Sequence, residues 1–438
     1  MVDGREDPLR EGAAAPSYAY SVFAIVFALM VVDYIDRQIV VSMFPYLKVE
    51  WGLSDGQLGA LVSIVSISVA LATVPLSLLA DRWSRVRSMF WMAIVWSCAT
   101  VACAFAQDYA QLLAARSIVG LGEAAYGAVG AALLSSLFPA RTRSTVLGAF
   151  LAAALVGSVV GTVLGGIISE RWGWRAGFGV AGIPGLILAV LFLAIVRDYR
   201  TVALPSMPRA GGRASMSAGA IVALLLRRRT VIVTCIGAGL QLVMVSATYA
   251  WMPSYLNRVY GFVPDRAGIA TGVVILMGGV GALLYSVVAD RMTMRFARAR
   301  LYVAAIASVT TAAVMYIAFA RVPPSDAQLA LIVAGATMMA GTVGPVAAVV
   351  IEVIHPALRA TAASILALTQ NLFGLAAGPL LTGFLSDAYG LPVALSVVPS
   401  FCVLAAATFV AAARTYERDL LNVKLCVGPE AMSTATRP

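Results

Sequence analysis

The chain has 438 residues; 61% are hydrophobic, 12% are charged, and the mean hydropathy is +0.90. Soluble domains are nearer half apolar and a quarter charged, so this composition excludes a large water-facing domain and predicts a chain that folds inside a membrane. The net charge of +10 comes without a basic stripe interleaved with aromatic residues, so we expect no nucleic-acid partner. The five cysteines show no CxxC spacing, and we expect no metal site and no cofactor.

Twelve apolar segments follow one another along the chain, each close to the ~20 residues that a helix needs to cross a bilayer. The expected helices are 19–46, 54–80, 88–107, 109–138, 144–168, 176–196, 230–256, 265–289, 301–320, 327–354, 361–385 and 391–413. The longest polar stretch, 197–229, separates six of them from the other six. We therefore predict an all-α integral membrane protein with bundles over 19–196 and 230–413, a linker over 197–229, and tails over 1–18 and 414–438.

Basic residues indicate the orientation in the membrane. Loops on the side of the N-terminus hold 17 lysine and arginine residues, whereas loops on the other side hold 6. Because positive charge stays on the cytoplasmic side, we expect both termini and the linker in the cytoplasm of a cell, inner or plasma membrane. Of 31 basic residues only Lys48 and Lys424 are lysines, which favours a GC-rich bacterial gene.

The two groups of helices share an internal repeat. Five residues of the first half recur in the second half, each 209 positions later. They are Gly52, Gly59, Ser77, Asp81 and Arg82, which recur as Gly261, Gly268, Ser286, Asp290 and Arg291. Self-similarity at a fixed offset predicts two parallel six-helix repeats.

The first expected helix carries three charges, Asp33, Asp36 and Arg37, inside an apolar segment. Each charge near the middle of a membrane costs about 2.5–3.5 kcal/mol, so these side chains must pair, bind protons or face water. Asp33 and Arg37 lie four apart on one helical face and can pair directly, which leaves Asp36 to find another partner. The alternative is that the Asp33–Arg37 pair only satisfies itself near the interface.

The fourth expected helix carries Arg116 and Glu123, seven residues apart on one face and therefore ~10 Å apart along the axis. Glu123 lies near the middle of its segment, where burial favours the protonated form, so it is a candidate for reversible protonation. Asp36 and Arg37 lie at the depth of Arg116, which predicts a network of these three with Glu123 deeper. A static ion pair that locks two helices is the alternative.

The second half has no matching charges in the middle of its helices. Glu352 and His355 fall at the cytoplasmic end of the tenth helix, where we expect them to face the interface. The centres of the seventh and eleventh helices instead carry neutral polar residues, namely Gln241, Thr248, Tyr249, Thr369, Gln370 and Asn371. One charged half and one mostly apolar half suit an amphiphile better than a sugar. These polar residues could also simply bond to neighbouring helices.

Two further features are structural candidates. In the turn over 81–87, Asp81 could cap a neighbouring helix, while Arg82 and Arg85 bind carboxylates or lipid phosphates; a role in topology alone is the alternative. Small residues that allow close helix packing line faces of the fifth and eleventh helices. These are Gly157, Gly161 and Gly165 in the fifth helix, and Gly374 and Gly378 in the eleventh.

Several motifs resemble a known group of transporters. DRWSR at 81–85 resembles the cytoplasmic signature of the major facilitator superfamily, although Ser77 and Ser84 stand where that signature has glycines. Within the superfamily, YIDR at 34–37 and RSIVGLGEAAY at 116–126 are similar to the Spinster-like lipid transporters. The resemblance covers 20–200, and the second half matches only through the general fold.

The resemblance implies a major facilitator fold with 12 transmembrane helices in two six-helix bundles. It also implies a monomer, not an enzyme, that moves lysophospholipids or phosphorylated sphingoid lipids by alternating access, with protons and membrane lipids as partners. Asp36 and Glu123 would be protonatable coupling residues, and Arg37 and Arg116 their partners or head-group anchors. The fifth helix lacks the proline of the antiporter-associated glycine motif, so the resemblance leaves symport and antiport open.

The other site residues follow from these expectations. Substrate or ion-pair contacts are expected from Arg37, Arg116, Asp33, Tyr126, Tyr249, Gln370 and Asn371. The cytoplasmic gate is expected to use Asp81, Arg82, Arg85, Asp290 and Arg291. Two other functions stay open: an organic-anion symporter or multidrug exporter of the same superfamily, and a membrane sensor that transports nothing.

Overall fold

The computed structural model describes residues 16–197, 228–354 and 359–427. Within them, twelve helical spans are long and apolar enough to cross a membrane. In the first half the helices are α1 (Pro16–Trp51), α2 (Asp55–Arg82), α3 (Arg85–Ala104), α4 (Tyr109–Glu123), α5 (Tyr126–Leu137), α6 (Ala140–Trp172) and α7 (Trp174–Ile195). In the second half they are α9 (Arg229–Tyr260), α10 (Pro264–Thr293), α11 (Ala299–Ala320), α12 (Asp326–Met339), α13 (Val343–Glu352), α14 (Arg359–Thr369), the π-helix η2 (Gln370–Leu375), α15 (Ala377–Tyr389), α16 (Leu391–Val397) and α17 (Pro399–Val427).

The helices differ from the expected segments at their ends and in their continuity. Four expected spans are broken, between α4 and α5, between α12 and α13, around η2, and between α16 and α17. The helix α17 runs past 413, where a tail was expected. Its polar residues after 413 continue the helix that the apolar segment begins. Most of the expected linker, along with residues 1–15 and 428–438, lies outside the described residues.

Polar caps and glycines fix where the spans begin and end. Ser54 and Gln57 form a capping box at the start of α2, which satisfies backbone N–H groups that a helix start leaves open. Gly52 and Gly261 follow α1 and α9 in the left-handed conformation, with φ of 65° and 66°, which glycine adopts without steric cost. Gly173 separates α6 from α7 with φ of 80°.

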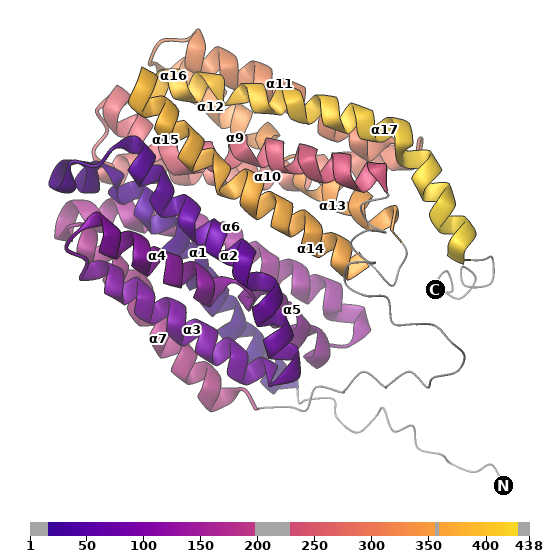
Figure 1. Ribbon diagram of the computed structural model, residues 1–438, viewed down its shortest axis with the longest axis horizontal. Coiled ribbons are helices and arrows are strands. Elements are labelled where there is room, and N and C mark those ends of the chain that lie inside the picture. The colour runs from indigo at the N-terminus through magenta and orange to yellow at the C-terminus, as the bar shows by residue number, and fades with distance from the viewer. Residues whose placement is uncertain (1–15, 198–227, 355–358, 428–438) are drawn as a thin grey trace.

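The two halves lie side by side and diverge toward one end (Figure 1). We call the end that holds the turns at 52–54, 173, 261–263 and 390 the closed end. There, α2 packs against α15 and α6 against α10, across the two halves. At the opposite, divergent end, the buried apolar clusters of the described residues stay within one half each.

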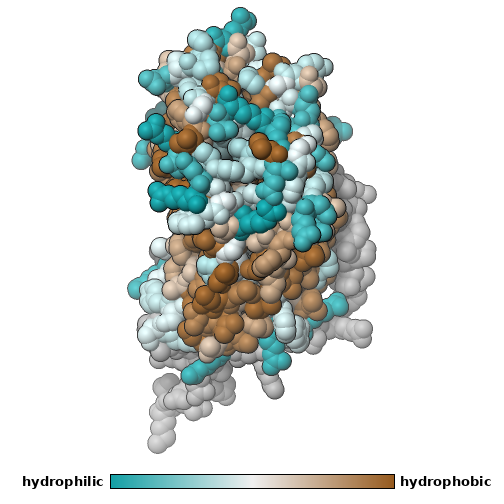
Figure 2. Space-filling view, turned by 90° about the vertical axis from the view of Figure 1, so that its left-hand side faces the viewer, coloured by the Kyte–Doolittle hydropathy of each residue, from teal (hydrophilic) through white to brown (hydrophobic). Residues whose placement is uncertain are grey.

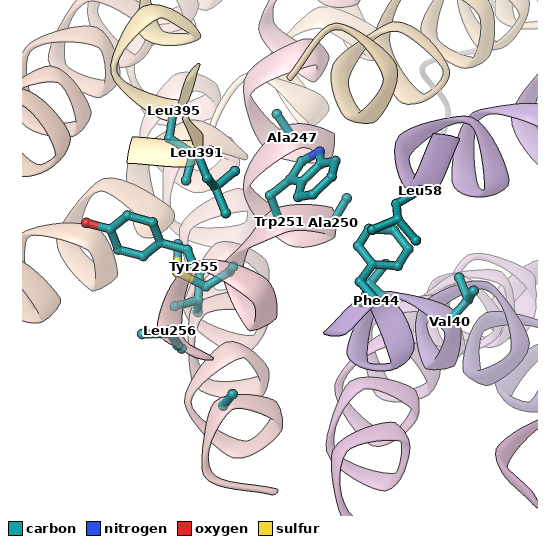
Figure 3. Packing of buried hydrophobic residues seen from close by; sticks show 14 of the residues in the cluster. Val40, Phe44, Leu58, Ala247, Ala250, Trp251, Tyr255, Leu256, Leu391 and Leu395 are labelled. Atoms are coloured by element: carbon teal, nitrogen blue, oxygen red, sulfur yellow. The ribbon is translucent and has the colours of Figure 1, made fainter. Parts of the chain in front are cut away.

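An apolar cluster shared by both halves fills the closed end (Figure 3). The rings of Phe44 on α1 and Trp251 on α9 lie 5.2 Å apart between their centroids. The Trp251 indole N–H donates to the carbonyl oxygen of Pro379 at 3.0 Å, which links α9 to α15. Viewed from this end, polar side chains cover most of the upper part of the surface, and apolar side chains gather in the lower part (Figure 2). Outward apolar side chains such as Ile183 and Ile187 on α7, each more than half exposed, suit a lipid surrounding.

Candidate transport site

The charged residues of α1 meet those of α4 inside the first half. Asp36 and Arg116 are fully buried, and Asp33 and Glu123 are each 3% exposed. Glu123 is the last residue of α4, so the break before α5 places its carboxyl group at a helix end. The Thr73 hydroxyl on α2 donates to the carbonyl oxygen of Ala124 at 2.8 Å, which satisfies a backbone group that the break leaves open.

Two ion pairs join α1 to α4, and a third contact lies within α1. Arg116 Nη1 lies 3.1 Å from Asp36 Oδ2, and it also donates to the Asp36 carbonyl oxygen at 3.4 Å. Arg37 Nη2 lies 2.8 Å from Glu123 Oε2, and its Nε lies 3.6 Å from Asp33 Oδ2. Asp36 therefore has Arg116 as its partner. Arg37 faces two carboxyl groups, an arrangement that the sequence did not indicate.

Several buried polar atoms around these pairs have no hydrogen-bond partner among the described residues. They include Asp33 Oδ1, Asp36 Oδ1, Glu123 Oε1 and the Tyr126 hydroxyl. Tyr126 is the first residue of α5 and is 1% exposed. Because leaving buried polar groups unpaired is costly, these atoms mark a place where a proton, water or a ligand group can bind.

A cavity between the two halves opens beside these charges. Both arginines, Arg37 and Arg116, line it from the first half. Its other first-half residues are Tyr34, Gln38, Val41, Val62, Val65 and Ser66, and the second half contributes Ser246, Tyr249, Ala250, Leu375 and Pro379. The cavity wall therefore carries two guanidinium groups on one side and only uncharged residues on the other.

Not every polar residue expected in the second half reaches this cavity. Tyr249 lines it, but Gln370 and Asn371 do not. The Asn371 amide donates to the carbonyl oxygen of Ala367, one turn earlier in its own helix, at 2.9 Å. The Gln241 amide donates to the Met339 carbonyl oxygen at 2.9 Å and so ties α9 to α12. The second-half wall depends instead on Ser246, which a sequence pattern could not separate from an ordinary helix serine.

A second, almost entirely apolar pocket of about 340 Å³ lies between α9 and the α14–η2 segment. It follows the same two helices that contribute Ser246 and Leu375 to the central cavity, nearer to the divergent end. Its lining residues are Val231, Ile232, Cys235, Ile236, Leu240, Ile365, Thr369 and Phe373. Phe373 is 66% exposed, so part of this pocket is accessible from outside the helix packing.

At the divergent end, three of the expected gate residues, Arg82, Asp290 and Arg291, show no ion pair between the halves within the described part of the chain. Arg82 and Arg291 are exposed, and Arg85 is the first residue of α3. Asp290 pairs with Arg300 of its own half at 2.9 Å. The side chain of Asp81 lies outside the described residues, as does His355.

Other residues at that end have local roles. Ser84 caps α3, since its hydroxyl accepts from the Arg87 N–H at 3.1 Å. Glu352, expected to face the interface, pairs with Arg300 and accepts from the Tyr416 hydroxyl at 2.8 Å.

The closed end carries a charged network that sequence reasoning missed. Asp55, the first residue of α2, accepts from both outer nitrogens of Arg258 at 2.6 and 2.8 Å and from the Ser386 hydroxyl at 2.5 Å. Lys48 lies 2.6 Å from the same carboxylate. In return, the Asp387 carboxylate accepts the backbone N–H groups of Asp55 and Gly56 at 2.7 Å each. Charges next to a turn look like ordinary loop charges in a sequence, so nothing there distinguished them.

The glycines singled out for packing lie where helices approach closely. A Cβ atom at Gly161 would lie 2.7 Å from the Ile35 backbone, and Gly157 and Gly165 contact α1 in the same way one turn to either side. Gly374 and Gly378 face α9. Among the described residues, no group of three or more His, Cys, Asp or Glu side chains is placed to hold a metal ion.

Comparisons with known proteins fit this architecture. The chain matches the Major Facilitator Superfamily over residues 26–377, most of its length, and it belongs to that superfamily of transporters. It is a multi-pass membrane protein with twelve spans.

Relatives within the superfamily include Spinster homologues. Protein spinster homolog 1 of Xenopus tropicalis is 26% identical over 404 residues, which cover 88% of this chain and 76% of that protein. The hexuronate transporter of Bacillus subtilis is 24% identical over 374 residues, covering 84% and 88% of the two chains. The crystal structure of a bacterial homologue of the human lysosomal transporter Spinster, in an inward-facing and unoccupied conformation, superposes with a TM-score of 0.83 at 22% identity, covering 93% of this chain and 99% of that one.

Proposed function

We propose that the chain is a secondary transporter that moves an amphiphilic anion, such as a lysophospholipid or a sphingoid phosphate, by proton-coupled alternating access. The observation that carries the proposal is the cavity wall: Arg37 and Arg116 face it from the first half, and an uncharged wall faces it from the second. Guanidinium groups bind phosphate and carboxylate through paired hydrogen bonds, so the head group would lie between the arginines.

The apolar pocket along α9 supports an amphiphilic substrate over a purely polar one. Its lining from Val231 to Phe373 offers almost no hydrogen-bonding group. A hydrocarbon chain that leaves the central cavity along α9 would bury its surface there, at about 25 cal/mol for each Å² removed from water. A hexuronate-sized anion would leave this pocket unused.

The closed and divergent ends support one state of an alternating-access cycle. The Asp55 network and the shared apolar cluster seal one end, while the halves separate at the other. With both termini in the cytoplasm of a cell membrane, as the positive-inside pattern favours, the divergent end faces the cytoplasm.

Proton coupling follows from competition for the arginines. Each arginine is already neutralised by a carboxylate, Glu123 for Arg37 and Asp36 for Arg116. An anionic head group that takes an arginine leaves its carboxylate without a cation, and protonation removes the resulting buried charge.

Labelled lysophospholipid flux into proteoliposomes, with and without an imposed pH gradient, tests the proposal. We expect gradient-dependent flux that Glu123→Gln makes insensitive to the gradient. Glu352→Gln is the matched control, because Glu352 pairs with Arg300 away from the cavity and its loss should leave the pH dependence in place. Normal, pH-dependent flux in Glu123→Gln would contradict the coupling role.

An organic-anion symporter is the second candidate, favoured by the similarity to the hexuronate transporter. A competition panel of lysolipids, hexuronates and cationic dyes separates the candidates, because only the transported class should inhibit uptake. Inhibition by hexuronates alone would replace the lipid with a small organic anion. Inhibition by the dyes alone would indicate a multidrug exporter. Binding without flux in sealed vesicles would indicate a sensor.

A further inference from the structure

The buried site of the first half contains unequal numbers of acidic and basic groups. Three carboxyl groups, those of Asp33, Asp36 and Glu123, meet only two guanidinium groups, those of Arg37 and Arg116. If all five were ionised, the site would carry a net charge of −1 in a place almost closed to solvent. An uncompensated buried charge is far more costly than a bound proton, so the site needs one more positive charge.

The other titratable groups around the site do not supply that charge. On α1, Tyr34 lies against Arg37, whose guanidinium carbon is 5.3 Å from the centre of its ring. On α5, Tyr126 lies near Asp33, and on α3, Cys103 lies near Arg116. From the second half, Tyr249 faces the cavity. All four are neutral near pH 7.

The geometry shows where the additional proton binds. Asp36 has Arg116 as a partner of its own, 3.1 Å away. Asp33 and Glu123 instead share Arg37: Asp33 Oδ2 lies 3.6 Å from its Nε and Glu123 Oε2 lies 2.8 Å from its Nη2, so both carboxyl groups face one guanidinium group. Each has an oxygen, Oδ1 and Oε1 respectively, without a hydrogen-bond partner in the part of the chain that the structure describes.

We propose that Asp33 and Glu123 form one proton-binding site, in which a single proton lies between the two carboxyl groups and Arg37 neutralises the remaining negative charge. Two ionised carboxylates can only accept, so they repel; with one proton present, the protonated acid donates to the other. Asp36 stays ionised opposite Arg116, so the site pairs Glu123 with Asp33 and not with Asp36.

The role of this acid pair in transport rests on the proposed function. An anionic head group that binds Arg37 removes the cation that both acids share. The acid that was still ionised then takes up a proton from water. The expected coupling is therefore about one additional proton for each negative charge that binds Arg37.

Infrared difference spectroscopy on purified, substrate-free protein tests the acid pair without any transport assay. A pH titration is expected to show one carbonyl stretching band of a buried protonated carboxylic acid. Asp33→Asn and Glu123→Gln should each abolish the band, because each leaves two acids opposite two arginines. The matched control is Asp36→Asn/Arg116→Gln, which removes the separate ion pair together, leaves the acid pair with Arg37, and should keep the band.

Each outcome decides the proposal. A band that persists in Asp33→Asn or Glu123→Gln overturns it, and a band lost in the double control assigns the proton to Asp36 instead. If Glu123→Gln does not fold, Glu123→Asp should shift the band frequency, and an unchanged frequency is equally contradictory. Absence of lysolipid flux together with the expected bands would contradict the proposed substrate and leave the proton site in place.

Discussion

The two halves of the chain share a backbone plan but differ in chemistry. Gly52 and Gly261, 209 positions apart, both follow a long helix in the left-handed conformation. Gly173 and Gly390 separate the last two spans of each half with φ of 80° and 84°. The fourth span of each half is also broken, between α4 and α5 and between α12 and α13. Turns and breaks are thus a property of the repeat.

The buried charges are a property of one half. The same shift of 209 positions places Asp36 and Arg37 on Val245 and Ser246 of α9. The second half folds around uncharged residues at these depths, so the fold does not require ionisable groups there. Charges that cost about 2.5–3.5 kcal/mol each in a membrane therefore need a reason other than the fold, and the proposed binding and proton transfer would supply it.

Removing one charge of a pair in the first half should have the largest effect. Arg116→Leu leaves the Asp36 carboxylate buried and unpaired, and we expect the free energy of unfolding to fall by about 3–5 kcal/mol. Asp36→Leu/Arg116→Leu replaces this one ion pair with apolar side chains, leaves Asp33, Glu123 and Arg37 in place, and should recover most of the stability but no transport. Unfolding in mixed detergent micelles measures both. A double variant no more stable than Arg116→Leu would show that other groups depend on the pair.

The reverse change introduces a charge into the neutral half. Ser246 is 7% exposed and donates to the Gly374 carbonyl oxygen at 2.9 Å, so Ser246→Arg places a cation on a wall that has no acidic residue of its own. We expect a loss of about 2.5–3.5 kcal/mol, measured as the free energy of unfolding. Ser246→Gln, which is long but neutral, is the control. Equal losses in both variants would mean that side-chain volume, not charge, limits this wall.

The closed end joins the two halves, and weakening it should have an intermediate effect. Asp55→Asn weakens the charged hydrogen bonds to Arg258 and Ser386, each worth about 1.5–3 kcal/mol, and favours opening at this end. Lys48→Gln is the matched control, because Lys48 lies in the same half as Asp55 and its contact does not hold the halves together.

Cysteine labelling measures this opening. Ser63 is 1% exposed, and its hydroxyl donates to the Ala376 carbonyl oxygen of the other half at 2.6 Å. Ser63→Cys, in a background without the natural cysteines, reports opening through its reaction with a membrane-impermeant thiol reagent. We expect a roughly tenfold or greater rise in labelling rate for Asp55→Asn, the factor that about 1.4 kcal/mol represents. Equal rates in Asp55→Asn and Lys48→Gln would contradict a role between the halves.

The sequence predicted the twelve spans, the repeat and the charged residues of α1 and α4, because apolar length and buried charge are visible in composition. It did not predict the breaks. Ala124 and Ala125 interrupt the fourth span without a proline or a polar residue, and the π-helix from Gln370 to Leu375 has no local signal that separates it from an α-helix. Such changes depend on packing between helices, which one sequence does not contain.

The partners of the charges were equally hidden. Spacing along α1 favoured Asp33 as the partner of Arg37, whereas Glu123 lies closer, at 2.8 Å against 3.6 Å. The choice depends on how α1 and α4 are rotated toward each other. Gly122 holds α4 close to α3, because a Cβ atom there would lie 2.6 Å from the Trp96 backbone nitrogen on α3. Local patterns give the residues of a site, but contacts between helices decide the pairs.

Glycine substitutions should have the smallest effect and test what the halves share. Gly161→Ala places a methyl group against the Ile35 backbone, and Gly378→Ala places one 2.6 Å from the Val243 carbonyl oxygen. We expect each to lower the free energy of unfolding by about 1–2 kcal/mol, the low end of overpacking, because a single methyl is added. Gly148→Ala, also in α6, meets open space and should instead stabilise the helix by up to ~1 kcal/mol. Similar losses for Gly161→Ala and Gly378→Ala would show that close helix packing is common to both halves. A loss confined to the first would mean that only the charged half depends on a close helix contact, since its ion pairs require α1 to be held in one position.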